Sequence, residues 1–147
     1  MSGKNAEPVI VLWMSRHDPL PAQLRELKER LGNYHLVHWS KKVSTDERAI
    51  QIIKDASAKY VIPVIPESIV KRLVEVQEEH GFRVLVPEME HLHNCENDQC
   101  EEFNPDTDAI VVSRDVETGE TIRRHKRFRG FVWRRRIVYE DEPAWWI

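Results

Sequence analysis

This chain of 147 residues has only two cysteines and five glycines, and it has no long apolar run. Two cysteines cannot form the disulfide framework of a small secreted protein. A membrane-spanning helix needs about 20 apolar residues, whereas the longest candidate run, Val9 to Met14, is far shorter. The first residues also lack the basic and apolar regions of a signal peptide. We therefore expect a cytoplasmic protein with no membrane partner.

Two glycine-rich phosphate-binding signatures are also missing. The chain contains neither GxGxxG nor GxxxxGK[ST], the motifs that carry dinucleotide binding and the P-loop. Any phosphate site must therefore be built from side chains and helix ends outside these motifs.

The composition is that of a globular, charge-rich protein, with 41% hydrophobic and 32% charged residues. The length predicts one domain, residues 1–147, large enough for its own core. High charge with only four glutamines is typical of thermophilic proteins.

Apolar runs alternate with helical patterns over residues 1–90. The expected strands are Val9–Ser15, Tyr34–Trp39, Tyr60–Ile65 and Phe82–Pro87. The expected helices begin at Pro21, at a capping box of Ser44 and Glu47, and at Pro66, and they end near Gly32, Ala56 and Gly81. This alternation predicts an α/β fold, a Rossmann-like three-layer core with a mostly parallel sheet. Pro63 suggests that the third strand lies at an edge or contains a bulge.

The pattern changes after residue 90. Residues 91–108 form a polar, acidic excursion, and residues 109–147 predict a C-terminal antiparallel β extension and a tail. Its expected strands are Ala109–Val116, Thr121–Arg129 and Phe131–Tyr139, with a bend or bulge at Gly130. We expect the apolar tail, Trp145–Ile147, to pack on its own domain or across a homodimer.

Polar side chains follow three of the expected parallel strands. Ligands of open parallel sheets bind beyond the carboxyl ends of the strands, and the sequence predicts a phosphate or nucleotide site there. Its candidate residues are Ser15, Arg16, His17, Ser40, Lys41 and Ser68. In a hydrolase, His17 would act as acid, base or nucleophile and Arg16 would stabilise the developing charge. The alternative is a solvated loop in which Asp18 caps a helix.

The run from Val11 to His17 resembles the Arg-His-Gly segment that ends the first strand of histidine phosphatases, where the histidine takes the phosphoryl group. The likeness covers seven residues, and Asp18 stands where that family has glycine. In architecture, the expected βαβ core is similar to Rossmann-like sensing domains of CRISPR systems, which bind cyclic oligonucleotides. These likenesses imply phosphoryl chemistry at His17 or a nucleotide ligand.

A second candidate site lies in the acidic excursion. On an extended strand His91, His93 and Cys95 share a face, and Cys100 could complete a tetrahedron of ligands. Two imidazoles and two thiolates suit Zn²⁺, and four protein ligands indicate a structural site. The alternatives are a disulfide between Cys95 and Cys100, or free thiols beside surface histidines.

The sign of the charge reverses along the last sixty residues. Glu88 to Asp106 holds seven acidic and no basic residues, whereas Thr121 to Arg136 holds eight basic and no acidic residues. Arginines near aromatic rings are typical of nucleic-acid binding. The candidate polyanion-binding residues are Arg123, Arg124, Lys126, Arg127, Arg129, Arg134 and Arg136. The alternatives are pairing with the 88–106 segment, in one chain or across a dimer, and protection of a sheet edge.

Of these functions we favour a ligand-binding or regulatory module that recognises a nucleotide or other phosphorylated ligand, in a homodimer. Catalysis needs a second group beside His17, and the candidates Glu67 and Glu88 have simpler roles as helix-start acids. A phosphoester hydrolase and a nucleic-acid-binding accessory protein using residues 121–136 are the alternatives.

Overall fold

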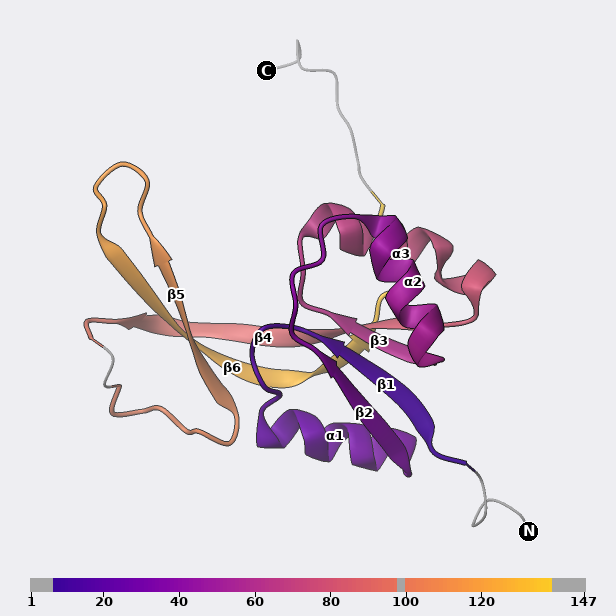
Figure 1. Ribbon diagram of the computed structural model, residues 1–147. Helices are drawn as coiled ribbons and strands as arrows, with labels where there is room; N and C mark the ends of the chain where they lie inside the picture. The colour runs from indigo at the N-terminus through magenta and orange to yellow at the C-terminus, as the bar shows by residue number, and fades with distance from the viewer. Residues whose placement is uncertain (1–6, 98–99, 139–147) are drawn as a thin grey trace.

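The structure is a computed structural model that describes residues 7–97 and 100–138. Within these residues, three helices alternate with the first four strands and two more strands follow, and the six strands form one sheet (Figure 1). The helices are α1 (Pro21–Leu31), α2 (Asp46–Ala56) and α3 (Glu67–His80). The strands are β1 (Val9–Met14), β2 (Tyr34–Trp39), β3 (Tyr60–Pro63), β4 (Arg83–Cys95), β5 (Asp108–Arg114) and β6 (Thr121–Trp133).

The first half of the chain forms a parallel sheet with the order β2-β1-β3-β4. Its two faces are covered by different helices: α2 and α3 lie on one face and α1 on the other (Figure 1). Leu12, Val61 and Leu73 belong to the larger apolar cluster, under α2 and α3, whereas Val11 and Leu27 belong to the smaller one, under α1. We call this part, residues 9–85, the parallel half.

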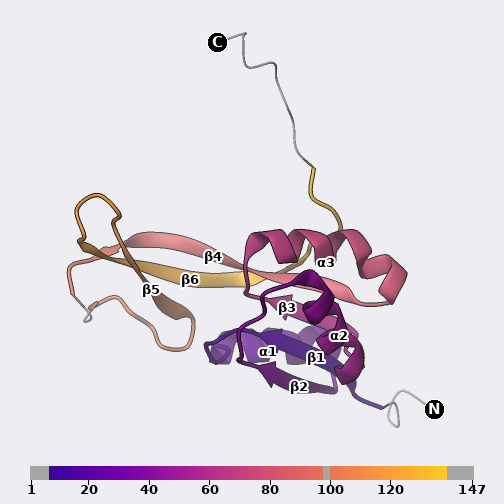
Figure 2. The same cartoon turned by 45° about the horizontal axis from the view of Figure 1, so that its top comes forward.

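Strand β4 continues far beyond the parallel half. Only Arg83 and Val84 pair with β3, but residues 85–95 pair with β6 in the antiparallel sense, and β5 adds to the far edge of β6. The long ribbon of β4, β5 and β6 runs away from the helices (Figure 2). We call residues 86–95 with β5 and β6, and the loops between them, the extension.

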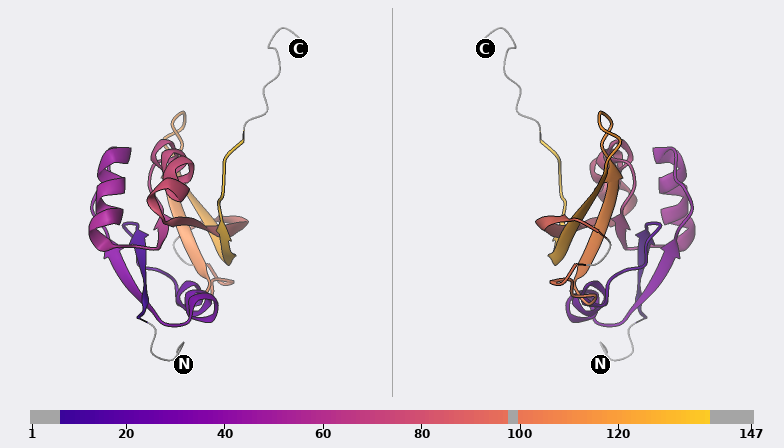
Figure 3. Two further views of the ribbon diagram at one scale, coloured as in Figure 1. Left: turned by 90° about the vertical axis from the view of Figure 1, so that its right-hand side faces the viewer. Right: turned by 90° about the vertical axis from the view of Figure 1, so that its left-hand side faces the viewer.

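The expected Rossmann-like three-layer core is therefore wrong. The sheet is mixed and curled (Figure 3), and its order β2-β1-β3-β4-β6-β5 makes the antiparallel strands part of the same sheet rather than an appendage. The physical reason is the length of β4. A strand of 13 residues has a long backbone edge with which β6 can pair, whereas a strand that ended at Pro87 would not have one.

Pro87 does not end β4, because a proline is tolerated in a strand where its missing N–H faces no partner. The pairing of β4 with β3 stops at Val84, so that side of the backbone is open at Pro87, which lies opposite Phe131 on β6. Pro63 also differs from its expected place: β3 lies between β1 and β4, and Pro63 is its last residue.

The expected ends of the helices agree closely with the observed ones. Pro21 opens α1, and Gly32 and Gly81 follow α1 and α3 with a φ of 73° that favours glycine. The start of α2 differs by one residue, because the Thr45 hydroxyl, rather than that of Ser44, accepts the N–H of Arg48.

Two of the expected extension strands form a single element. Strand β6 runs through Gly130, which has a φ of 134°, and Arg129 is the extra residue of a bulge opposite Glu88 and Met89. The expected strand Phe131–Tyr139 ends at Trp133. The tail Trp145–Ile147 lies outside the described residues. Among the described residues, no helix is long and apolar enough to cross a membrane.

Candidate metal centre

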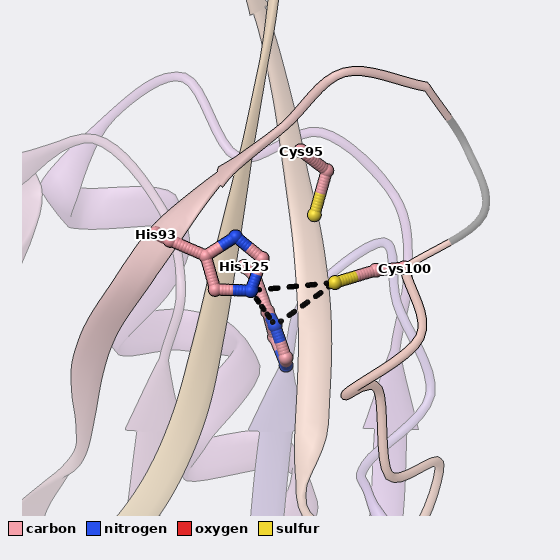
Figure 4. A group of neighbouring side chains, drawn as sticks. All are labelled: His93, Cys95, Cys100 and His125. Carbon is pink, nitrogen blue, oxygen red and sulfur yellow. Dashed lines mark hydrogen bonds between the residues drawn. The ribbon is translucent and has the colours of Figure 1, made fainter.

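Four metal-ligating side chains converge in the extension. His93 and Cys95 come from the end of β4, Cys100 from the following loop and His125 from β6 (Figure 4). One ligand atom from each of these residues lies within 4.8 Å of the other three. This group could hold a metal ion.

A bulge in β4 decides which histidine joins the group. His91 lies opposite Lys126, whereas His93 lies opposite His125, so Leu92 is an extra residue between two successive pairs. Opposite residues of an antiparallel pair share a face of the sheet. His91 and His93 therefore lie on opposite faces, although regular alternation would place them on the same one.

The distances within the group are close to those of a tetrahedral site. His93 Nε2 lies 3.1 Å from His125 Nδ1, and Cys100 Sγ lies 3.4 Å from each of these nitrogens. Usual Zn–N and Zn–S bond lengths separate tetrahedral ligand atoms by about 3.3 Å for two nitrogens and about 3.6 Å for nitrogen and sulfur. Three of the distances between ligand atoms are thus close to those of a tetrahedral zinc site.

A buried carboxylate orients His125. The Nε2 of His125 lies 2.6 Å from Asp108 Oδ2, and both side chains are fully buried. Hydrogen bonds from Arg127, then from Thr107, the Asn104 backbone and His125, hold the pKa of Asp108 well below its usual range, although burial alone would raise it. The ionised carboxylate can only accept, so Nε2 carries the hydrogen of this bond and Nδ1 is the nitrogen left to bind a metal.

The surroundings of the group are partly apolar and partly acidic. The Phe103 ring lies 5.7 Å from that of His125, between ring centroids, and Glu102 Oε2 lies 3.7 Å from His93 Nε2. An open hollow of about 410 Å³ over the group is also lined by Glu96 and Glu101. Carboxylates around the opening favour the approach of a cation.

Both cysteines are free thiols, and no disulfide joins them. Burial, followed by the nearby Cys100, raises the pKa of the Cys95 thiol. In the absence of a metal, both effects favour the protonated form of the Cys95 thiol. A bound dication would reverse this preference, because metal binding deprotonates the thiol.

His91 lies outside the group and His125 takes its place. The exposed imidazole of His91 has its Nε2 3.0 Å from Asn94 Oδ1. From the sequence, His125 was assigned to the basic strand, because its nearness to His93 depends on pairing between residues 32 positions apart. The sequence marks His125 only as an imidazole on a strand of basic residues, which does not reveal that it pairs with His93.

The candidate phosphate site is a separate hollow, at the carboxyl ends of β1 and β3. It has a volume of about 260 Å³, and Ser15, Arg16, His17 and Lys41 all line it, together with Lys42. Ser40 and Ser68 do not line it. The structure thus brings four of the six candidate residues together with Lys42, which stands beside Lys41 after the expected second strand.

The loop that carries these residues is held by its own hydrogen bonds. The indole N–H of Trp13 donates to His17 O at 2.7 Å, and the His17 N–H donates to Ser15 Oγ at 3.1 Å. Asp18 lies 3.5 Å from His38 Nδ1 and does not cap α1, whose N-cap residue is Leu20. Neither Glu67 nor Glu88 lines the hollow.

The basic residues of β6 have several separate partners. Arg127 forms a two-pronged pair with the buried Asp108, Arg129 pairs with Glu90, and Arg124 donates to Ser113 Oγ. Arg123 lies opposite Cys95, and Lys126 lies on the other face of β6. Arg134 and Arg136 lie beyond the end of β6, and Arg136 lines a cavity that contains none of the metal-ligating residues. The expected basic surface is therefore divided, and part of it pairs with acidic residues of the same chain.

Comparisons with protein-family models, with curated proteins and with solved structures find no match to this chain. The assignment of a function therefore depends on the geometry of the sites described above.

Proposed function

We propose that this chain is a zinc-binding α/β protein in which Zn²⁺, bound by His93, Cys95, Cys100 and His125, holds the extension in its folded form. The observation that carries the proposal is the convergence of two imidazoles and two thiols within 4.8 Å. The hydrogen bond from His125 to Asp108 supports it, because metal-bound histidines usually donate their second N–H to a carboxylate or carbonyl.

The donor set favours zinc over other ions. Thiolate sulfur and imidazole nitrogen in a tetrahedral arrangement suit Zn²⁺, whereas Mg²⁺ and Ca²⁺ prefer oxygen ligands. Four protein ligands leave no position for a reacting water, which is typical of a structural site. The need for two reduced thiols also supports a cytoplasmic location, where cysteines stay reduced.

Metal analysis of the purified protein tests the proposal. We expect one zinc per chain, and after replacement by Co²⁺ we expect the visible bands of a tetrahedral cobalt site together with near-ultraviolet thiolate-to-metal charge transfer. The absence of zinc and of any charge-transfer band after reconstitution under reducing conditions would contradict the proposal, as would a native Cys95–Cys100 disulfide found by mass spectrometry.

Single substitutions test the assignment of each ligand. Cys100→Ser and His125→Asn should each weaken zinc binding by about 100-fold or more, because each removes a metal–ligand bond. His91→Asn is the matched control, since His91 lies on the same strand but on the other face, and it should bind zinc as the wild type does. Equal losses for His91→Asn and His125→Asn would show that the proposed ligand set is incorrect.

We also propose, as a second function, that the hollow at the carboxyl ends of the parallel strands binds a phosphorylated small molecule or nucleotide. The observation in its favour is the grouping of Arg16, His17, Lys41 and Lys42 around one opening, because guanidinium, imidazole and ammonium groups donate to phosphate oxygens. The lining described here contains no carboxylate that could serve as a second catalytic group, which favours binding over hydrolysis.

A thermal-shift panel of nucleotides tests this second function. A ligand that binds the folded state raises the melting temperature, and Arg16→Ala combined with His17→Ala should abolish the shift. Lys28→Ala with Arg30→Ala on α1 removes the same type of charge elsewhere and should leave the shift intact. No shift with any nucleotide argues against the site. The expected homodimer and thermophilic character stay predictions, to be checked by light scattering and by melting.

A further inference from the structure

A larger cavity lies at the opposite edge of the parallel half, where β3 and β4 begin. Its volume is about 780 Å³. It is lined by residues from the last turn of α3, from the beginnings of β3 and β4, and from the end of β6 and the segment after it, among them Lys59, Glu78, Arg83, Trp133, Arg135 and Arg136. Nothing in the proposed zinc site uses these residues.

The cavity gathers positive charge that no ion pair among the described residues neutralises. Four of the lining residues are basic, namely Lys59, Arg83, Arg135 and Arg136, whereas Glu78 is acidic. Within residues 7–97 and 100–138, none of these four basic side chains forms an ion pair. By contrast, Arg127 and Arg129 pair with acids of the same chain. Uncompensated positive charge around a concave surface attracts anions.

Two of the guanidinium groups are held in place by an aromatic ring. The guanidinium carbon of Arg83 lies 4.2 Å from the centre of the Trp133 ring, and that of Arg135 lies 5.1 Å from it. Cation–π contacts of this kind restrain a planar guanidinium while its N–H groups stay available to a ligand. The Trp133 ring is itself fixed, because its Nε1 donates to Gln77 Oε1 at 3.0 Å.

A buried glutamine also fixes the backbone around the cavity. Gln77, only 4% exposed, donates from Nε2 to the carbonyl oxygens of Arg134 and Arg135 at 2.7 and 3.3 Å, and accepts from the N–H of Val84 at 2.9 Å. One side chain thus ties α3 to the start of β4 and to the segment after β6. The arginines are preorganised, which lowers the entropic cost of binding a ligand.

We propose that this cavity is a second anion site, which binds the phosphate groups of a nucleotide or of single-stranded nucleic acid. Arginine forks donate two parallel hydrogen bonds to phosphate, and Arg83 and Arg135 are positioned to do so. A cavity of this size holds more than a single phosphate group. Trp133, 42% exposed, and the guanidinium planes beside it offer flat surfaces for stacking of a base.

Binding measurements on the full chain, loaded with zinc, test the site. A fluorescein-labelled oligothymidylate is followed by polarisation at low salt, and ATP is followed by calorimetry, so that the two sources of phosphate are distinguished. For at least one of them, Arg83→Gln with Arg135→Gln should weaken binding by about tenfold or more. For the oligonucleotide, the double variant should also reduce the slope of log affinity against log salt by about 1.4, because each phosphate contact on a single strand contributes about 0.7.

Two controls separate this site from other charged surfaces. The first control, Lys28→Gln with Arg30→Gln on α1, removes equal charge and should leave binding unchanged. The second control, Arg16→Gln with Lys41→Gln, measures how much of the binding belongs to the hollow at the opposite edge of the parallel half. Absence of binding to both ligands at low salt overturns the proposal, and so does a double variant at Arg83 and Arg135 that is folded by circular dichroism and binds as the wild type does. An equal loss in the α1 control also overturns it, because binding would then reflect net charge alone.

Discussion

The parallel half and the extension are stabilised by different kinds of interaction. In the described part of the chain, every buried apolar side chain except Phe128 lies between Val11 and Val84. The extension instead buries His125 and Asp108, a polar pair joined by a hydrogen bond. Apolar burial is cumulative and needs no bound ion, whereas a polar centre is stable only when each of its groups has a partner. The extension is therefore the part of the molecule that we expect to depend on a metal.

The largest expected effect is in the apolar core of the parallel half. Leu73, which is fully buried in the cluster under α2 and α3, leaves a cavity when it is replaced by alanine. Leu73→Ala should lower the free energy of unfolding by about 2–5 kcal/mol, with and without zinc, as measured by urea denaturation. Val112→Ala on β5, where the side chain is 59% exposed, is the control and should change it by no more than about 0.5 kcal/mol. Comparable losses in both variants would remove the distinction between the two regions.

Removal of zinc should have the next largest effect, confined to the extension. At a free zinc concentration of about 100 times the dissociation constant, binding contributes about 2.7 kcal/mol of stability. After chelation, hydrogen exchange should accelerate in β5, in β6 and in residues 86–95 of β4, while β1 and β3 stay protected. Uniform acceleration throughout the sheet would mean that the two regions unfold as one unit.

Loss of the carboxylate behind His125 should have a smaller effect. Asp108→Asn keeps the shape of the side chain but removes the charged acceptor of the His125 N–H, and such changes lower metal affinity by about 10–100-fold. Asp115→Asn, in the turn between β5 and β6 where Asp115 accepts the N–H groups of Glu117 and Thr118, is the control. Competition with a chromogenic chelator measures both affinities, and an unchanged affinity in Asp108→Asn would show that Asp108 does not support the site.

The smallest expected effect is at the ion pair that joins the two regions. Arg25 on α1 pairs with Asp106 in the loop of the extension, and its hydrogen bond lowers the pKa of the Asp106 carboxyl. Because the folded-state pKa is the lower one, this stabilisation is present above about pH 4 and is lost as the pH falls further. Asp106→Asn should therefore lower the melting temperature slightly at pH 7, and this difference should shrink as the pH falls toward 2. A difference of the same size at both pH values would assign the effect to packing instead.

The same two regions differ in how well their structure could be predicted from the sequence. In the parallel half, local signals placed most elements: Pro21 and Gly32 bound α1, and Tyr34–Trp39 is β2 residue for residue. The position of β3, which Pro63 suggested to be at an edge, was wrong. In the extension, they were not. The length of β4 depends on its pairing with β6, and Pro87 is compatible with that strand only because β3 has already ended.

The candidate sites show the same limit. Ser15, Arg16, His17 and Lys41 were predicted to lie together because the carboxyl ends of parallel strands meet at one edge of a sheet. His93, Cys95 and Cys100 are close in sequence and could be grouped by spacing. His125 could not be placed, since its pairing with His93 follows from a bulge at Leu92, and the sequence around Leu92 has no glycine or proline to mark it.

Because of that bulge, the ligand set depends on whether an even or an odd number of residues separates the ligand positions along β4. Deletion of Leu92 would restore regular alternation and leave His93 opposite His125, so we expect it to preserve the site. Deletion of Asn94 would instead move Cys95 to the position opposite Arg124, on the other face of the sheet. Among related sequences, we therefore expect single-residue gaps to occur at position 92 and to be excluded between the two β4 ligands.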